Sequence, residues 1–363
     1  MGDNCFSYQE RITDVFDQKK SAVVRVFGVN KVAPSPEGTG AQEPILDICT
    51  GFFISREGHV MTVANVANEA QALWVAYNKI PYPAELVGFD NNTNIAIIRL
   101  LKPPSNLPFL HLGELIDIPK PSTMLLAITC TLGQEASPSM GMVTGWHTDS
   151  LDNIVFPTTF LRSNIPSVLG EGGSPVFDLM GRFAGVIVDS IDEIRSSFII
   201  PARAVMHIRD DLVFSGKVSY AYLGVDLDEK AIMTTDSCII KEIIQGGPAE
   251  QGGLKNGDKI LEFDSMPIQS LMDFRNATFF VRPKQVVSIK VQRDNKEFKF
   301  PVRLSEKPAS LLNIAIVQPE KNLEQAKEQH NVTPVQKNPV ASQKKVEAII
   351  KKSNYWNTYL KAL

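Results

Sequence analysis

IIKEIIQGGPAEQGGLKNGDKILEFDSMPI, residues 239–268, is the stretch that decides the fold of the second half of the chain. Two apolar runs of the length and composition of β-strands enclose a segment rich in glycine. Pro248 suits the first turn of a short helix, and Gly252 and Gly253 suit its end. The sequence Asn-Gly-Asp at 256–258 is typical of a tight turn. The stretch therefore predicts a strand, a short helix, a turn and a second strand.

The residues that follow complete a small mixed unit. A helical pattern runs from about 271 to 280, and two strands follow at 286–294 and 296–304. The dipeptide Asp294-Asn295 between these strands favours a tight hairpin turn. Residues 306–363 are different, because they hold nine Lys, five Glu and scattered Pro, which is typical of a disordered tail. Near the end, apolar residues fall at helical spacing and predict an amphipathic helix.

The first two hundred residues read as many short strands. Runs such as SAVVRVFGV (21–29), ALWVAY (72–77) and IAIIRL (95–100) are β-branched or aromatic and end at Gly, Pro, Asn or Asp. No regular helix separates them, so an antiparallel sandwich or barrel is expected. One helix is predicted, over about 202–212.

Three stretches carry a family resemblance: GFFISREGHVMTVANVANEA (51–70), LVGFDNNTNIAIIRL (86–100) and NIPSVLGEGGSPVFDLMGRFAGVIV (164–188). In order and spacing, together with 239–268, they resemble proteins of the HtrA/Deg (protease Do-like) family. The resemblance implies a mainly β fold, in which a trypsin-like double β-barrel precedes an α+β PDZ domain and a flexible tail. The expected divisions are an N-terminal segment, a protease-like domain, a PDZ domain and a tail, at 1–20, 21–214, 215–305 and 306–363.

The resemblance also assigns the catalytic positions. Asn65 stands where the family has its catalytic His, Asn94 where it has Asp, and Gly172 where it has the nucleophilic Ser. Acyl transfer needs a hydroxyl, a base that titrates near the working pH and a carboxylate that orients the base. These three residues provide none of them, which predicts a pseudoprotease.

The alternative is an active serine-type endopeptidase with a non-standard site. Ser174, two residues past the nucleophile position, is the displaced candidate, and His59 is a candidate base. Both also suit ordinary structural roles, as a loop hydroxyl and a turn residue.

The PDZ resemblance predicts a groove for peptide C-termini or unfolded segments, formed by strand addition to a sheet edge. The amides of a Gly-containing loop would hold the carboxylate, and the helix after Gln269 would form the opposite wall. The alternative is an ordinary turn beside a closed pocket. The residues expected to line the groove are Tyr222, Leu223, Gly224, Val225, Phe274 and Thr278.

Composition limits the other partners. The net charge of −3 gives no argument for nucleic acid, and no apolar run is long enough to span a membrane. The four cysteines are widely spaced with no metal-site pattern, so neither a metal nor another cofactor is expected. The family resemblance implies a homo-oligomer, a trimer. No signal or transit peptide is visible, and the expected location is therefore intracellular, cytoplasmic or nuclear.

Overall fold

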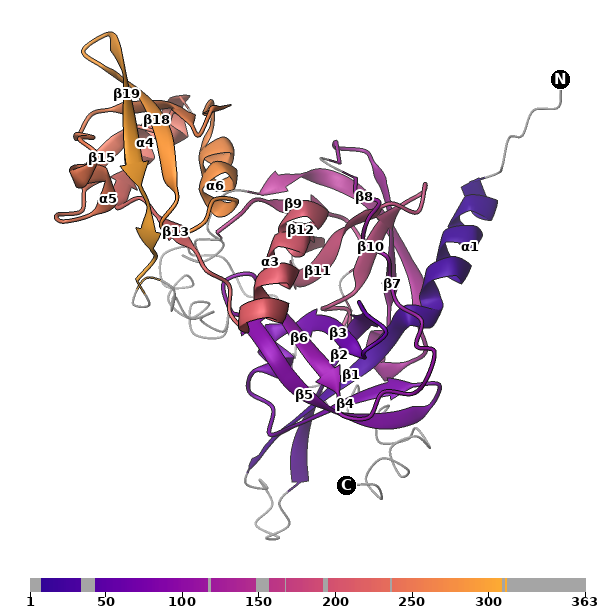
Figure 1. Ribbon diagram of the computed structural model, residues 1–363. Coiled ribbons are helices and arrows are strands. Elements are labelled where there is room, and N and C mark those ends of the chain that lie inside the picture. Colours follow the sequence, from indigo (N-terminus) through magenta and orange to yellow (C-terminus); the bar gives the residue numbers. More distant parts are fainter. Residues whose placement is uncertain are drawn as a thin grey trace, which may run out of the picture.

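The computed structural model shows two β-barrels and a smaller domain set to one side (Figure 1). The structure describes residues 8–33, 43–116, 119–147, 157–166, 168–191, 195–235, 237–308 and 311. The expected flexible tail and its amphipathic helix lie outside this part of the chain, apart from the first few residues. The predicted mainly β architecture is confirmed, with the double barrel first and the PDZ domain after it.

The first barrel is closed by six antiparallel strands in the order β1-β2-β3-β6-β5-β4. A short helix, α2 (Ala64–Ala67), follows β3 directly. Its strands are β1 (Val23–Ala33), β2 (Glu43–Phe53), β3 (His59–Val63), β4 (Ala72–Tyr77), β5 (Ile80–Asp90) and β6 (Ile95–Leu100).

The second barrel repeats the design in the order β10-β11-β12-β9-β8-β7. A 3-10 turn, η2 (Thr131–Gly133), lies between β7 and β8, the two strands of this barrel that come first along the chain. Its strands are β7 (Met124–Thr129), β8 (Ser137–His147), β9 (Phe160–Ser163), β10 (Pro175–Asp178), β11 (Phe183–Ile191) and β12 (Ser196–Pro201).

Strand β6 shows why the barrel strands read as nearly continuous apolar runs. Its successive side chains point to opposite faces of the sheet. Ile95 and Ile97 enter a core shared by both barrels, whereas Ala96 and Ile98 fill the interior of the first barrel. Both faces are therefore buried, and alternation with polar residues is lost.

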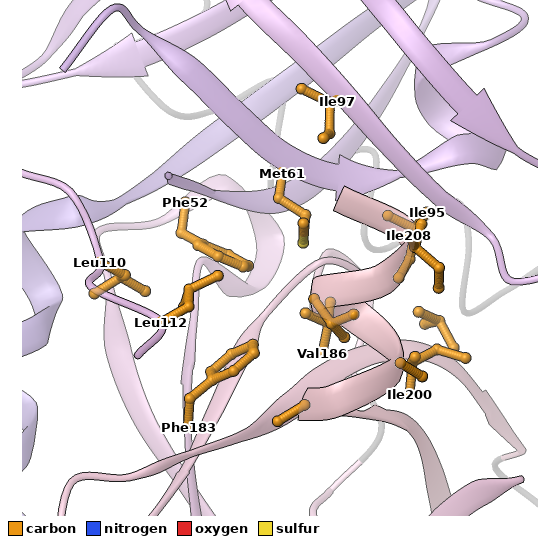
Figure 2. Close-up of a cluster of buried hydrophobic side chains, with 14 of the residues drawn as sticks. Phe52, Met61, Ile95, Ile97, Leu110, Leu112, Phe183, Val186, Ile200 and Ile208 are labelled. Atoms are coloured by element: carbon orange, nitrogen blue, oxygen red, sulfur yellow. The ribbon is translucent and has the colours of Figure 1, made fainter. Parts of the chain in front are cut away.

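The shared core lies between the barrels and is closed by helix α3 (Ala202–Ser215). Figure 2 shows Phe52 and Met61 of the first barrel facing Phe183 and Val186 of the second. Ile208 of α3 reaches the same cluster, so the predicted helix over 202–212 is confirmed. Burial of such large side chains is the main favourable term that joins the two barrels.

A helix that the sequence pattern did not lead us to expect precedes the first strand. Helix α1 (Tyr8–Lys19) and the 3-10 turn η1 (Lys20–Ala22) lie along the side of the second barrel (Figure 1). Val15 is buried, and Ile12 and Phe16 pack against the shared core. These three residues have helical 3–4 spacing, which is the signal that could have revealed the helix.

The third unit has the predicted PDZ elements. The hairpin is confirmed, since Arg293 pairs with Lys296 and both Asp294 and Asn295 have positive φ, as a type I′ turn requires. The strands are β13 (Ala221–Tyr222), β14 (Val225–Leu227), β15 (Ile240–Ile243), β16 (Lys259–Phe263), β17 (Met266–Pro267), β18 (Val286–Arg293), β19 (Lys296–Arg303) and β20 (Ser305–Glu306). The helices are α4 (Glu229–Thr235), α5 (Pro248–Gln251) and α6 (Leu271–Phe279).

The PDZ unit is docked on the barrels through α6 and the segments beside it (Figure 1). Thr159, just before β9, donates to the Asn276 side-chain oxygen at 3.0 Å. Arg282 forms an ion pair with Asp211 of α3 at 2.5 Å. Polar contacts thus link α6 to the second barrel and the segment after α6 to α3.

Candidate functional site

Asn65 and Asn94 are brought together by the pairing of two strands. Strand β3 runs antiparallel to β6, with Val63 opposite Ile95. The residues just after β3 must therefore lie beside the residues just before β6. The backbone N–H of Asn65 donates to Asn94 Oδ1 at 2.9 Å, and the N–H of Ala64 donates to the Asn94 carbonyl at 3.1 Å.

Gly172 reaches the same place from the second barrel, on the loop between β9 and β10. The Thr50 N–H donates to the Gly172 carbonyl at 2.9 Å. A Cβ added at Gly172 would lie 3.4 Å from Val63, which ends β3 just before Asn65. The three positions assigned by resemblance thus meet where the two barrels face each other.

The side chain of Asn94 is held from both ends. Its Oδ1 accepts from Asn65, and its Nδ2 donates to the Val188 carbonyl of β11 at 2.7 Å. Asn94 also has a φ of 55°, a left-handed conformation that Asn adopts more readily than most residues. The amide carries no charge near neutral pH and neither accepts nor returns a proton, so its contribution here is the link between barrels.

The glycine loop, residues 170–173, has a shape that its neighbours fix. The Thr50 hydroxyl donates to the Gly170 carbonyl at 2.7 Å, and the Gly173 N–H donates to the Ile187 carbonyl at 2.8 Å. Gly173 has a φ of 87°, and a Cβ there would lie 2.0 Å from the Thr50 carbonyl oxygen. Only glycine fits at this position. The sequence pattern gave no sign of Thr50, because its role depends on contacts across the barrels.

Ser174 and His59 have separate partners. Ser174 is fully buried, and its hydroxyl donates to the Glu171 carbonyl at 2.5 Å. His59 lies at the start of β3, where Nδ1 is 2.9 Å from the Ser55 hydroxyl. Burial, with a smaller effect from Arg99, lowers the pKa of His59. The geometry does not bring the two residues together as a nucleophile and a base, which would need a direct hydrogen bond.

In the PDZ loop 222–225, the carbonyl groups of Leu223 and Gly224 point toward the segment 244–249. The Leu223 carbonyl accepts from the Ala249 N–H at 2.9 Å, and the Gly224 carbonyl accepts from the Ile244 N–H at 3.0 Å. In a trans peptide the N–H points opposite to the C=O. The amides of Gly224 and Val225 therefore point away from the 244–249 segment. Gly224 has a φ of 78°, a left-handed conformation that glycine adopts without steric cost, which explains why glycine occupies this position.

Strand β14 and helix α6 form the sides of the expected groove. Among the described strands β14 pairs with β15 alone, which leaves one edge unpaired. On α6, the Phe274 ring meets Phe263 edge-on with centroids 6.1 Å apart, and the Thr278 hydroxyl bonds the Phe274 carbonyl at 3.0 Å. Both side chains are half-buried. Tyr222 ends β13, and burial raises the pKa of its phenol.

Within the described residues, no three His, Cys, Asp or Glu side chains gather in a way that could hold a metal ion. In the same part of the chain, no helix is both long enough and apolar enough to cross a membrane.

Comparison with known proteins agrees with this arrangement. Residues 49–186 match the model of the trypsin-like peptidase domain, and residues 221–304 match the model of the PDZ domain. A "Probable periplasmic serine endoprotease DegP-like" from Marinomonas sp. strain MWYL1 is 32% identical over 290 residues, which cover 75% of this chain and 60% of the relative. One of the same description from Chlamydia pneumoniae is 27% identical over 297 residues, 78% of this chain and 59% of the relative.

Solved structures share the fold. The structure titled "HtrA-type protease AlgW with decapeptide" is 21% identical and superposes with a TM-score of 0.66, covering 82% of this chain and 99% of that one. The serine endoprotease from Yersinia pestis is also 21% identical, with a TM-score of 0.58, and covers 82% and 98%.

A trypsin-like double barrel followed by a PDZ domain defines the class of protein. Within that class, the chain belongs to the HtrA/Deg family. The matches span about three fifths of the length of the curated relatives.

The relatives correct the expected location. Those from Chlamydia pneumoniae, Marinomonas and Halomonas elongata are named periplasmic, which points to an extracytoplasmic location. The expectation of a cytoplasmic or nuclear protein is therefore wrong. A targeting leader is a separate segment that leaves no trace in the folded domains, so failing to see one is a poor guide to the compartment.

Proposed function

We propose that this chain is a pseudoprotease that binds peptide C-termini or unfolded segments without hydrolysing them. The observation that carries the proposal is the identity of Asn65, Asn94 and Gly172 at the positions that resemble the family's base, carboxylate and nucleophile. Two amides and a glycine provide no hydroxyl to attack and no group that takes up a proton near pH 7. The bond from Asn94 to Val188 supports a structural use of that amide.

The PDZ domain is the proposed binding module. A peptide C-terminus would add as a strand to the unpaired edge of β14, with its carboxylate at the outward amides of Gly224 and Val225. Phe274 and Thr278 of α6 would contact its last side chains. Structures of the similar HtrA-type protease AlgW are described as complexes with a decapeptide and with a tripeptide. By family resemblance the assembly is a homo-oligomer, a trimer.

The glycine loop is a second peptide contact in this proposal. A segment lying against residues 170–173 would meet backbone amides but no nucleophile, so it would be held and released intact. Binding of this kind suits a scaffold, a holdase-like binder or an inactive partner of active paralogues.

Loss of hydrolysis is tested with a fluorophosphonate probe and a casein degradation assay on the full chain. An active HtrA protease is the positive control, and circular dichroism shows that the sample is folded. We expect neither label nor degradation. A stoichiometric label that maps to Ser174 would show that the chain is an endopeptidase with a non-standard site.

Peptide binding is tested by fluorescence polarisation with a labelled decapeptide that ends in apolar residues, prepared as the free acid and as the C-terminal amide. We expect the amide to bind at least about tenfold more weakly, because it has no charge for the loop amides. Thr278→Arg, which fills the groove, should reduce binding to the same extent. The matched control is Thr234→Arg, because Thr234 is exposed on α4, outside the groove. Equal binding of acid and amide would contradict capture of the carboxylate.

A further inference from the structure

Strand β14 presents an acid on its outer face. Val225 and Leu227 pack against the core of the PDZ unit, whereas Asp226 between them is exposed. Successive side chains of a strand point to opposite faces of the sheet. Asp226 therefore projects away from the apolar core, on the face of β14 that is open to solvent.

A second acid stands directly across the strand pair. Asp226 is paired with Glu242 of β15 in the antiparallel register, so the two side chains lie on the same face. Glu242 is exposed as well. In the part of the chain that the structure describes, neither carboxylate has a hydrogen bond or an ion pair. Like charges directly opposite each other destabilise a strand pair, so a cation beside these two acids would stabilise it.

The charges nearby do not neutralise the two acids. Lys230 follows β14 on α4, and Lys241 is the extra residue at the register shift beside Glu242. Both lysines are exposed, and neither forms an ion pair with a described residue. Residues 225–243, which hold β14, α4 and β15, contain five acidic residues and two lysines, a net charge of −3. This side of the expected groove is therefore negative.

The register of a bound peptide is set by the proposed carboxylate site, and the inference rests on that proposed function. The amides of Gly224 and Val225 lie at the start of β14, so a peptide whose carboxylate they hold runs antiparallel to the strand. Its last residue is then level with Val225, and its penultimate residue is level with Asp226. Residues opposite each other on antiparallel strands share a face. The last side chain therefore points toward the core and α6, and the penultimate side chain lies beside Asp226.

We propose that the PDZ groove selects peptide C-termini in which a lysine or an arginine directly precedes an apolar last residue. The cation lies beside Asp226, and its long side chain extends toward Glu242 on the next strand. Neighbouring strands are about 4.8 Å apart, a distance that either side chain spans. The two acids thus determine specificity at the penultimate position, in addition to the capture of the carboxylate by the loop amides.

The test uses two labelled decapeptides of identical composition, measured with the full chain by fluorescence polarisation at low salt. Both are free acids that end in valine. One has its single lysine directly before the valine, and the other has that lysine at its first position. We expect the first peptide to bind at least about threefold more tightly. The equal net charge of the peptides removes general attraction to an acidic protein from the comparison. The preference should fade at high salt, because exposed charges are screened.

Variants of the two acids check which residues cause the preference. Asp226→Asn and Glu242→Gln each remove one charge and keep the shape of an exposed side chain, so the fold should tolerate them. Each should reduce the preference, and the double variant should bind the two peptides equally. Asp226→Lys should instead favour a peptide with glutamate at the penultimate position. The matched control is Asp264→Asn, at an exposed acid between β16 and β17 on a different sheet, and it should leave the preference unchanged.

Two results would overturn this specificity while leaving the proposed function in place. They are equal binding of the two peptides by the unchanged protein, and a preference that persists in the double variant. If neither peptide binds to protein that circular dichroism shows to be folded, the peptide groove itself is contradicted, and the specificity fails with it.

Discussion

The side-chain amide of Asn94 donates a hydrogen bond of 2.7 Å to the backbone carbonyl oxygen of Val188, and so joins the start of β6 to β11 of the other barrel. The oxygen of the same amide accepts the Asn65 N–H at 2.9 Å. This position needs a donor at one end and an acceptor at the other, which an amide provides and an ionised carboxylate does not.

Replacing Asn94 by Asp tests that requirement. In the variant, a carboxylate oxygen replaces the Asn94 Nδ2 and faces the Val188 carbonyl oxygen. The variant therefore loses one hydrogen bond and places two hydrogen-bond acceptors against each other. We expect a loss of about 1–3 kcal/mol in the free energy of unfolding at neutral pH, measured by urea denaturation. The loss should shrink in acid, where the protonated carboxyl can donate to Val188. Asn65→Asp, at an exposed side chain, is the control and should change stability by less than about 0.5 kcal/mol.

Two neighbouring glycines should respond differently to a single methyl group. Gly173→Ala places a Cβ 2.0 Å from the Thr50 carbonyl at a φ of 87°, whereas Gly172→Ala places it 3.4 Å from Val63. We expect Gly173→Ala to lose more than about 3 kcal/mol or to fail to fold. Gly172→Ala should remain near wild type. Thermal unfolding of both variants measures this difference in stability. Equal melting temperatures would refute the close approach of Gly173 to Thr50.

Rebuilding the triad tests whether the rest of the site is intact. Gly172→Ser alone provides a hydroxyl without a base, and we expect a folded protein that a fluorophosphonate probe does not label. The triple change Asn65→His, Asn94→Asp and Gly172→Ser provides all three groups, and labelling of the new serine is expected. If the triple variant is folded yet remains unlabelled, the glycine loop does not present its amides as an active protease does.

The buried phenol hydroxyl of Tyr220 should contribute more to the stability of the fold than the hydroxyl of Tyr222. Tyr220 donates to Asp90 at 2.6 Å, and both residues are 6% exposed. Removing the hydroxyl in Tyr220→Phe leaves the Asp90 carboxylate with one donor fewer, which should cost about 1–3 kcal/mol by urea denaturation. Tyr222→Phe is the matched control, because that ring is half-exposed. Equal losses in the two variants would show that the bond to Asp90 contributes nothing.

His207 should make stability depend on pH. Its ring packs against Phe279 and Phe280, and burial is the main reason that its pKa is below the ordinary value, with Arg282 adding to the effect. The unfolded chain therefore takes up a proton first as pH falls. Stability should be full above a pH of about 6.5, the ordinary histidine pKa, and should decline below it until the folded form is protonated as well.

The measurement for His207 is the urea midpoint at several pH values. His207→Gln should flatten the decline below the ordinary histidine pKa. The pKa of His59 is also lowered, so His59→Gln measures the share of the decline that belongs to the first barrel. A decline that His207→Gln leaves unaltered would show that the buried ring of His207 does not cause the pH dependence.

Features that depend on neighbours along the chain could be predicted from the amino-acid sequence alone. The turn residues Asp294 and Asn295 specified the hairpin, the glycines of 239–268 placed the α5 turn, and the spacing of Val205, Ile208 and Leu212 indicated α3. These signals are local, because positive φ, helix ends and apolar periodicity are properties of a few consecutive residues.

Contacts between residues that are distant along the chain became visible only in the folded protein. The bond from Asn94 to Val188 and the anchor of Tyr220 on Asp90 each join segments that are far apart in sequence. No local pattern encodes such contacts, since they follow from the closure and packing of both barrels. The use of the Asn94 amide at a position that resembles a catalytic carboxylate became visible only when the second barrel was in place.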